Sequence, residues 1–314
     1  MVTTTTTMSI KTLIVVVGAT GSGKTDLSLR LATHFSAPIL STDSRQVYRG
    51  LPIGTAQPTA EQLATAEHHF IASHDLTDNF SCGEYEVQAL ARLEQLFVEH
   101  DTVVAVGGSG LYIQALCEGM DELPEADEEL RNELINRLNA EGVESLAAQL
   151  KVLDPQYYEV VDRQNPARVM RALEVCLVSG TKYSELRKSE RKERDFQIVK
   201  IGITMPREEL YDRINRRVDI MVEMGLEAEA RAVLPYRHCN SLKTVGYAEM
   251  FDYFDSKITF EEAVELIKRN SRRYAKRQIT WFGRDSQIAW FNRGEENQII
   301  KYIDAQFGES DINS

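Results

Sequence analysis

The fold is decided by residues 13–25, which read Leu13-Ile14-Val15-Val16-Val17-Gly18-Ala19-Thr20-Gly21-Ser22-Gly23-Lys24-Thr25. The first five are apolar, as in a strand buried on both faces of a parallel sheet. The other eight match the phosphate-binding pattern G-x-x-x-x-G-K-[ST] in full, and a helical pattern follows to about Phe35. This order predicts a P-loop, whose backbone N–H groups and helix N-terminus surround phosphate oxygens. Lys24 would neutralise a terminal phosphate and Thr25 would hold Mg²⁺. The alternative is a chance glycine loop, and even a true P-loop fixes neither a nucleotide nor hydrolysis.

Further strand patterns extend this unit into a sheet. Pro38–Ser41 and Thr102–Val106 are predicted strands, and Gln197–Ile203 is a later one. Strands that alternate with helices, such as Leu111–Cys117, indicate a parallel sheet with covered faces. The predicted class is therefore α/β, with a P-loop NTPase-like parallel sheet core flanked by helices. Ligands of such folds bind beyond the carboxyl ends of the strands, so the loops there should converge.

The middle of the chain predicts an all-helical insertion domain. Residues 120–195 are rich in charge and poor in strand patterns, which leaves 1–119 and 196–314 as the catalytic core. Helices are expected in the insertion and after it, at Glu128–Leu138, Val143–Leu150, Pro166–Val178, Lys182–Arg191, Glu208–Met224 and, as the last one, Thr259 to about Phe282.

Composition sets limits on location and partners. No apolar run approaches the ~20 residues that cross a bilayer, and the N-terminal threonine run, expected to be disordered, lacks the features of a signal peptide. None of the four cysteines forms a C-x-x-C pair, which favours reduced thiols and a cytoplasmic protein. The net charge of −12 argues against nucleic acid, but the basic residues are unevenly placed.

Polar residues at the expected strand ends are candidates for chemistry. Asp43 directly follows a strand, where it could act as a general base or equally cap a turn. The loop 107–110 brings small residues to another strand end and lacks the aspartate that NTPases place there for Mg²⁺. Arg213 and Arg217 share a helix face and suit a pyrophosphate leaving group, although a solvated charged face is the common alternative.

Two basic runs indicate a polyanionic partner. One lies in the last expected helix and is interleaved with aromatic residues; it comprises Lys268, Arg269, Arg272, Arg273, Lys276 and Arg277, with Tyr274, Trp281 and Phe282. The other is residues 187–192 in the insertion. Either run alone could be a solvated face, but two runs with aromatics favour a polyanionic partner, since basic groups contact nucleic-acid phosphates and aromatic rings can stack on unpaired bases.

From Leu13 to about Trp290 the chain resembles the tRNA dimethylallyltransferases, also called tRNA isopentenyltransferases. The motifs that carry the resemblance are GATGSGKT at 18–25, STDSRQVYRGLPIGTA at 41–56, the glycine loop with Leu111 and Tyr112, Asn165–Val175, Thr244–Tyr247 and AKRQITWF at 275–282. Several of these are not general features of P-loop proteins.

The resemblance implies a prenyltransferase that moves a dimethylallyl group from its diphosphate to N6 of the adenosine on the 3′ side of the anticodon. The P-loop residues Gly18, Ala19, Thr20, Gly21, Ser22, Gly23, Lys24 and Thr25 would then bind the diphosphate. Asp43, Ser109 and Arg217 would be catalytic, as general base, hydrogen-bonding hydroxyl and partner of the departing diphosphate. Thr25 would bind Mg²⁺. Ser109 stands where the family usually has threonine.

The resemblance also implies a set of tRNA contacts. They are Asp43, Ser44, Arg45, Gln46, Ser109, Arg131, Ala167, Arg168, Val169, Met170, Arg171, Lys243, Gly246, Tyr247, Arg273, Lys276, Arg277, Gln278 and Trp281. Three positions depart from the pattern of the family. Ala167 replaces a more usual glutamine, Ala248 stands where a basic or polar residue is common, and Gln57 replaces a usual lysine. These changes concern individual contacts and not the activity. We expect the tRNA anticodon stem-loop and dimethylallyl diphosphate as partners, no membrane, and a monomer.

Three other functions fit parts of the sequence. A small-molecule P-loop kinase would use Asp43 to orient an acceptor, but the strand-end aspartate is missing at Gly107. A prenyltransferase of free adenine nucleotides would need neither the insertion nor the basic helix. A non-catalytic RNA-binding protein would have no need of an intact P-loop with Asp43 and Arg217.

Overall fold

The computed structural model describes residues 10–125, 127–188 and 190–310 of the chain. The N-terminal threonine run lies outside these residues. The chain divides into two compact units, one formed by 1–117 with 194–314 and the other by 118–193. The expected boundaries, at 119/120 and 195/196, lie close to this division.

The larger unit is built on a parallel sheet. Within the described residues the sheet has six strands in the order β3-β2-β4-β1-β5-β6, and every neighbouring pair is parallel. The strands are β1 (Thr12–Gly18), β2 (Ile39–Ser41), β3 (His68–His69), β4 (Thr102–Val106), β5 (Gln197–Thr204) and β6 (Ala289–Asn292). The predicted α/β class is confirmed, and all carboxyl strand ends meet at one edge.

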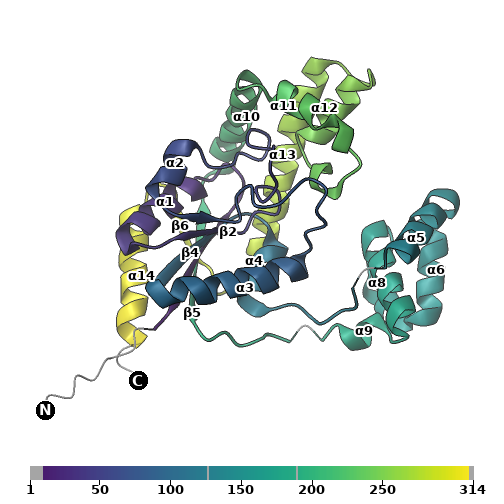
Figure 1. The fold of residues 1–314 in the computed structure, drawn as a ribbon, viewed down its shortest axis with the longest axis horizontal. Helices are drawn as coiled ribbons and strands as arrows, with labels where there is room; N and C mark the ends of the chain where they lie inside the picture. The colour runs from purple at the N-terminus through teal and green to yellow at the C-terminus, as the bar shows by residue number, and fades with distance from the viewer. Residues whose placement is uncertain (1–9, 126, 189, 311–314) are drawn as a thin grey trace, which may run out of the picture. The chain divides into compact units, whose positions relative to one another are not determined.

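Alternate residues of β1 serve two separate cores. Leu13, Val15 and Val17 pack against α3 (Cys82–Glu99) and α4 (Gly110–Glu118). Ile14 and Val16 pack against α1 (Lys24–Phe35) and α14 (Glu296–Ser310) on the other face (Figure 1). Every residue of β1 is buried, which explains why Leu13–Val17 form a continuous apolar run instead of an alternating pattern.

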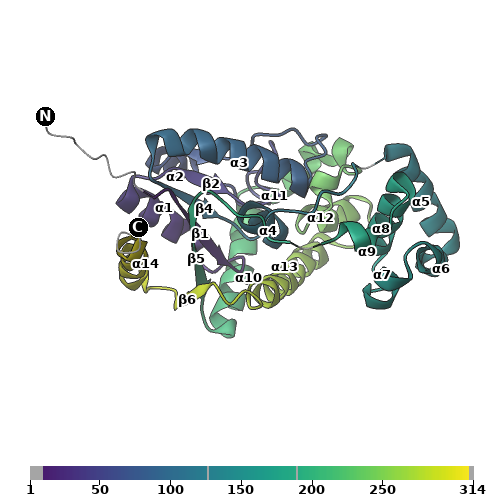
Figure 2. The same ribbon diagram turned by 90° about the horizontal axis from the view of Figure 1, so that it is seen from below.

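The C-terminal half adds helices beyond the sheet edge. They are α10 (Arg207–Glu223), α11 (Leu226–Ala232), α12 (Tyr247–Phe254) and α13 (Phe260–Phe282), while short α2 (Ala60–Thr65) lies earlier in the chain. A capping box of Thr259 and Glu262 fixes the start of α13, and α13 packs against α10 (Figure 2). No described helix is both long and apolar enough to span a bilayer.

The smaller unit is all-helical and has its own core. Its helices are α5 (Glu128–Glu141), α6 (Val143–Leu153), α7 (Pro155–Val160), α8 (Pro166–Ser179) and α9 (Tyr183–Leu186). Leu134, Leu150, Val169 and Leu173 form the centre of that core. The buried carboxylate of Asp154 accepts hydrogen bonds from the backbone N–H groups of Tyr157 and Ser184, at 3.0 and 2.7 Å. It thereby joins α7 to α9.

Two element predictions were wrong. The helix expected over Lys182–Arg191 ends at Leu186, since only its first turn packs on the insertion core. The helix that ends at Phe282 is not the last one, because β6 and α14 follow it and complete the sheet and the α1 layer.

The chain enters and leaves the insertion at one spot. The guanidinium of Arg194 donates to the carbonyls of Ala115 and Leu116, at 2.7 and 3.0 Å, and pairs with Glu86 at 3.0 Å. On the insertion side, the N–H of Lys192 donates to the carbonyl of Glu118 at 2.7 Å. Both side chains of the Arg194–Glu86 pair are 9% exposed, so this is a buried ion pair.

Candidate active site

The P-loop has the backbone that its glycines allow. Gly21 and Gly23 have φ of 81° and 97°, and Gly23 caps α1 in the left-handed region that side chains avoid. The hydroxyl of Ser22 is buried and has no hydrogen-bond partner among the described residues. Buried hydroxyls are normally satisfied, so this one suits a bound phosphate oxygen.

Lys24 lies folded over the loop. Its Nζ donates to the carbonyl of Ala19 at 2.8 Å. Burial and, to a smaller extent, the charge of Arg217 lower the pKa of Lys24, Asp43 opposes both, and the result is a pKa of about 8. The ammonium is therefore held where an anion would be its natural partner.

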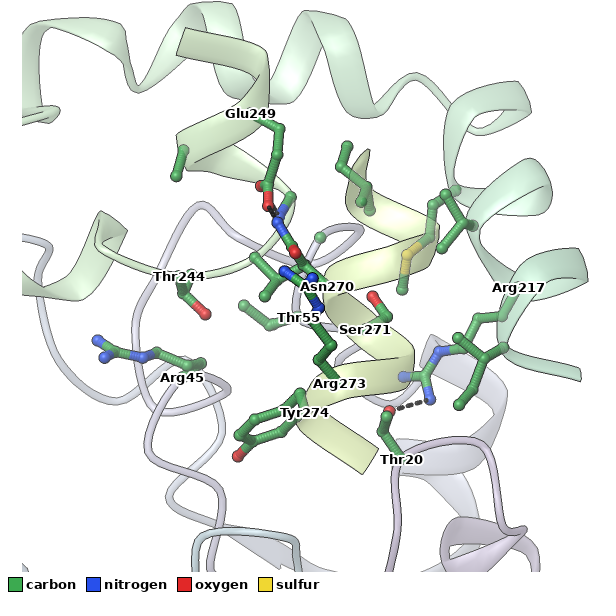
Figure 3. A pocket seen from close by; sticks show the side chains of 18 of the residues that line it. Thr20, Arg45, Thr55, Arg217, Thr244, Glu249, Asn270, Ser271, Arg273 and Tyr274 are labelled. Atoms are coloured by element: carbon green, nitrogen blue, oxygen red, sulfur yellow. Dashed lines mark hydrogen bonds between the residues drawn. The ribbon is translucent and has the colours of Figure 1, made fainter. Parts of the chain in front are cut away.

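Two arginines of α10 reach the P-loop. Arg213 Nε donates to the carbonyl of Gly21 at 2.9 Å, and Arg217 Nη1 donates to Thr20 Oγ1 at 3.3 Å (Figure 3). Burial lowers the pKa of Arg217, while Asp43 raises it. The structure thus places both side chains on the loop instead of on a solvated helix face.

Asp43 has the two features that the sequence left as alternatives. Its Oδ1 accepts the backbone N–H of Arg45 at 2.8 Å and of Gln46 at 3.3 Å, which is a turn-capping arrangement. Its charge also acts on Lys24 and Arg217, so the carboxylate faces the cationic P-loop. Capping the turn holds the carboxylate in this place.

Ser109 and Gln278 tie the strand-end loops together. Ser109 Oγ accepts the N–H of Ser44 at 2.9 Å and donates to Ser44 Oγ at 3.0 Å, joining the ends of β4 and β2. Gln278 is buried, accepts the N–H of Thr20 at 2.8 Å and donates to the carbonyl of Gly108 at 2.9 Å. A side chain expected to contact tRNA therefore has both ends of its amide on backbone.

Two cavities adjoin these residues. The larger, of about 760 Å³, extends from Thr20, Asp43 and Arg217 to the loop before α12 (Figure 3). Its apolar wall consists of Ile214, Val218, Met221, Leu226 and Ile267. The second, of about 460 Å³, is rich in aromatic side chains: Tyr48, Phe80, Tyr112, Tyr274, Trp281 and Phe282. The two cavities share Ser44, Arg45, Tyr274 and Arg277.

The basic run of α13 divides into two sets. Lys268 pairs with Asp219 at 2.8 Å and Arg272 donates to Asn215 at 2.5 Å, so both side chains are directed at α10. The remaining cations, Arg269, Arg273, Lys276 and Arg277, are exposed, as is Trp281. The guanidinium of Arg277 lies over the ring of Tyr274, 5.6 Å from its centroid.

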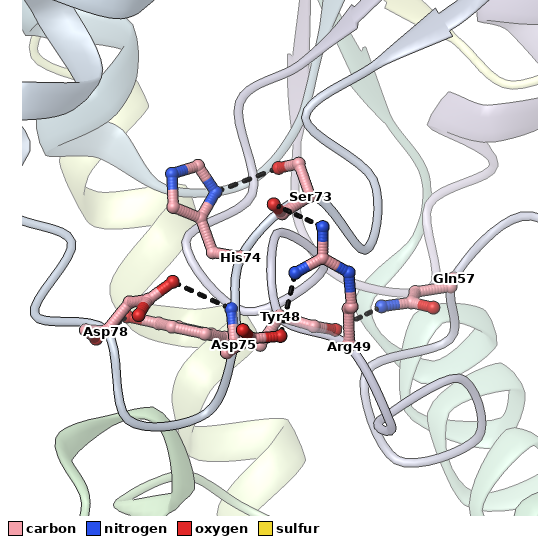
Figure 4. A network of polar contacts seen from close by, with 7 residues as sticks. All are labelled: Tyr48, Arg49, Gln57, Ser73, His74, Asp75 and Asp78. Atoms are coloured by element: carbon pink, nitrogen blue, oxygen red, sulfur yellow. Dashed lines mark hydrogen bonds and ion pairs between the residues drawn. The ribbon is translucent and has the colours of Figure 1, made fainter.

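The loop after Asp43 is braced by polar contacts (Figure 4). Arg49 pairs with Asp75 at 2.7 Å and donates to the carbonyl of Ser73 at 2.8 Å. Gln57 donates to the carbonyls of Gln46 and Tyr48 at 2.9 and 2.8 Å. In this chain Gln57 therefore serves the loop itself.

A partly buried carboxylate, Glu229, holds the end of the same loop. It accepts the N–H groups of Ile53 and Gly54 at 2.8 Å each and the hydroxyl of Tyr247 at 2.6 Å. A Cβ on Gly54 would lie 2.6 Å from the Tyr247 ring. Tyr247 is fully buried, so its side chain has a packing role, whereas Lys243 is exposed and lines the larger cavity with Gly246.

The expected tRNA contacts of the insertion lie on or beside α8. Arg131 and Arg171 donate to the same oxygen of buried Glu174, at 2.9 and 2.7 Å. Ala167 and Arg168 are exposed, Val169 is buried in the insertion core, and Met170 packs against it.

Three roles had no signal in the sequence. The clamps formed by Glu229 and Glu174 and the bridge formed by Gln278 join residues far apart in the chain, and nothing local distinguishes these side chains from surface ones. The apolar wall of the larger cavity also reads as ordinary helix core.

The fold and this site define a P-loop protein whose sheet edge is built to hold a phosphate chain beside a carboxylate. Residues 46–285 match the family model described as IPP transferase. The chain is 53% identical to tRNA dimethylallyltransferase 1 of Phocaeicola vulgatus, over 93% of this chain and 97% of that protein. It is 50% identical to the protein of the same name from Bacteroides fragilis, over 95% and 99%.

Solved structures give the same result. The tRNA isopentenylpyrophosphate transferase of Bacillus halodurans has a TM-score of 0.71 and 38% identity, over 96% of this chain and 99% of that one. A eukaryotic dimethylallyltransferase, solved acting on tRNA, has a TM-score of 0.76 at 24% identity, over 90% and 74%, and shares the fold. The chain belongs to the IPP transferase family.

Proposed function

We propose that this protein transfers the dimethylallyl group of dimethylallyl diphosphate to N6 of the adenosine on the 3′ side of the anticodon in tRNA, releasing diphosphate. Transfer of a dimethylallyl group to tRNA is the activity for which its relatives are named. The donor is argued from the site, and the atom and the position are those that the resemblance to the family implies.

The observation that carries the proposal is the larger cavity. One end presents Thr20 and Arg217, with Lys24 and the P-loop amides beside them, and suits a diphosphate. The apolar wall formed by α10, α11 and α13 suits a hydrocarbon chain. A ligand with a diphosphate at one end and a short hydrocarbon at the other matches both.

The residues then have distinct roles in one displacement. The bond from N6 to the allylic carbon forms as the bond from that carbon to oxygen breaks, and diphosphate leaves with the electron pair. Asp43 takes the proton from N6. Lys24, Arg217 and the P-loop N–H groups stabilise the negative charge that develops on the leaving oxygens. Ser109 holds Ser44 and the turn beyond Asp43 in register.

Mg²⁺ is the proposed cofactor. Among the described residues no group of three or more His, Cys, Asp and Glu side chains is placed to hold a metal. Magnesium is commonly held by one or two protein oxygens together with substrate phosphates, and the exposed Thr25, in the first turn of α1, fits that donor set. When bound, the ion would supply charge neutralisation at the diphosphate.

The exposed cations of α13 and the aromatic cavity support tRNA as the acceptor. Arg273, Lys276 and Arg277 suit phosphates, and Trp281 suits stacking on an unpaired base. The target adenine must leave its stack before its N6 atom can react in an enclosed site, as in other base-modifying enzymes. We further propose a monomer that acts in the cytoplasm.

The test compares wild type with Asp43→Asn and Asp43→Ala. The protein is incubated with Mg²⁺, dimethylallyl diphosphate and unmodified tRNA whose anticodon is followed by adenosines, and the digested tRNA is analysed by mass spectrometry. The Asn variant keeps an oxygen for the N–H groups of Arg45 and Gln46 but loses the base, so we expect both variants to lose about 10²–10⁴-fold in rate. Full activity of Asp43→Asn would contradict the role of Asp43 as the general base. Prenylation of free AMP without modification of tRNA would show that tRNA is not the acceptor.

A further inference from the structure

Gln278 lies between the P-loop and the loop after β4. It belongs to α13 and is 5% exposed. Its Oε1 accepts the N–H of Thr20 in the P-loop, and its Nε2 donates to the carbonyl of Gly108 in the loop after β4. One buried amide therefore spans both loops.

The loop after β4 is shaped to receive α13. A Cβ on Gly108 would lie 2.1 Å from Gln278 Nε2, and a Cβ on Gly110 would lie 2.3 Å from Trp281 Nε1. A side chain at either position would displace the Gln278 amide or the Trp281 ring from its place. The glycines that the sequence suggested for close approach of a ligand thus admit the helix instead.

Thr20 is where this bridge meets α10. Its backbone N–H donates to Gln278, and its hydroxyl accepts from Arg217. Thr20 is therefore held from two helices at once, and its position sets where the Arg217 guanidinium lies. The N–H of Thr20 is committed to Gln278, so Gln278 acts on the phosphate site through the placement of Thr20.

The same helix presents exposed cations. Arg273, Lys276 and Arg277 lie within five residues of Gln278 and are exposed, while Gln278 is buried. One face of α13 thus braces the P-loop and another carries the charges suited to RNA.

We propose that Gln278 is a positioning residue that sets the P-loop and Arg217 for the diphosphate and ties them to the RNA-facing helix. The link to RNA rests on the proposed function. The effect on the diphosphate does not, because it follows from contacts within the core alone.

The experiment measures binding of inorganic pyrophosphate with Mg²⁺ by calorimetry, for wild type, Gln278→Leu and Gln278→Glu. Leucine removes both hydrogen bonds at similar volume, so we expect about tenfold weaker binding. A charged carboxylate would repel the Gly108 carbonyl, whereas a protonated one can donate to it. Gln278→Glu should therefore bind weakly at neutral pH and regain affinity, relative to wild type, as the pH falls.

The control is Thr259→Ala, which removes the capping box of the same helix far from the site. We expect it to lower the melting temperature and leave pyrophosphate affinity unchanged. Unchanged affinity in Gln278→Leu, or no relative recovery of Gln278→Glu in acid, would overturn the proposal. A wild type that binds pyrophosphate but does not modify tRNA would contradict the proposed function and leave the role of Gln278 at the diphosphate intact.

Discussion

Lys24 makes the phosphate affinity of the P-loop depend on pH. Burial lowers its pKa to about 8 in the ligand-free protein, so the ammonium loses its charge above that pH. We expect pyrophosphate binding to weaken as the pH rises through this value, by up to about tenfold per pH unit because one proton is involved.

Lys24→Arg provides the matched control, because a guanidinium stays charged over the same range. Calorimetric titrations on both sides of that pH check the expectation. An identical pH profile in wild type and Lys24→Arg would mean that a group other than Lys24 determines it.

Single residues also show where inference from sequence ends. The roles of Gly21, Gly23 and Lys24 follow from a local pattern, because the P-loop is built from neighbours in the chain. Tyr247 and Gln278 sit in motifs equally well matched to the family, yet their side chains are buried against distant parts of the chain, Tyr247 on Gly54 and Gln278 on Thr20. A match to a motif does not say whether a side chain contacts a ligand or supports the fold.

At the scale of elements, Glu229 fastens the loop after Asp43 to α11 and α12. Removing its carboxylate leaves the N–H groups of Ile53 and Gly54 and the hydroxyl of Tyr247 without their acceptor. We expect Glu229→Ala to lower the free energy of unfolding by about 2–3 kcal/mol. Chemical denaturation checks this.

The matched control is Glu227→Ala, on the same helix, whose carboxylate pairs with exposed Arg231. It should cost about 0–1 kcal/mol. Equal losses in the two variants would show that Glu229 contributes no more than a surface ion pair.

Elements with a clear start and a buried face could be predicted from sequence. The helix over Lys24–Phe35 and the strand over Thr102–Val106 have the predicted bounds, since glycines or buried β-branched residues define them. Helix α9 is shorter than expected. The charged residues after Leu186 have a local preference for helix, but a helix persists in a protein mainly where one face packs against other elements. Strand β6 was not predicted because a strand of four residues, none of them fully buried, is too short to show a period in the sequence.

At the scale of the molecule, Arg194 closes the core where the insertion interrupts it. Its partner Glu86 is as buried as Arg194 itself. Arg194→Ala removes this buried ion pair together with the hydrogen bonds to the carbonyls of Ala115 and Leu116, so we expect a loss of about 3–5 kcal/mol in the free energy of unfolding.

Arg191→Ala is the control at the same junction, since its ion pair with Glu118 is exposed on the arginine side. It should cost no more than about 1 kcal/mol. Denaturation followed by tryptophan fluorescence suits the comparison, because Trp281 and Trp290 both lie in the larger unit. A stable Arg194→Ala would mean that the junction is held by other contacts.

The architecture of the whole chain was the most predictable level. A buried strand, a P-loop and recurring strand–helix units leave few alternatives to a parallel sheet, and a charged stretch without strands can only be an inserted helical segment or a disordered one. Which cavity results at the sheet edge depends on how α10, α11 and α13 pack, and that depends on contacts between distant residues.

The bridge from Thr20 to Gln278 also has a consequence in time. The ribosome makes the P-loop before α10 and α13, and Arg213, Arg217 and finally Gln278 emerge 192, 197 and 258 positions after their loop partners. At roughly 5–20 residues per second, that interval lasts on the order of tens of seconds. A growing chain, or a transcript cut short before α13, would therefore carry the complete phosphate-binding signature while lacking the supports that set it for its ligand.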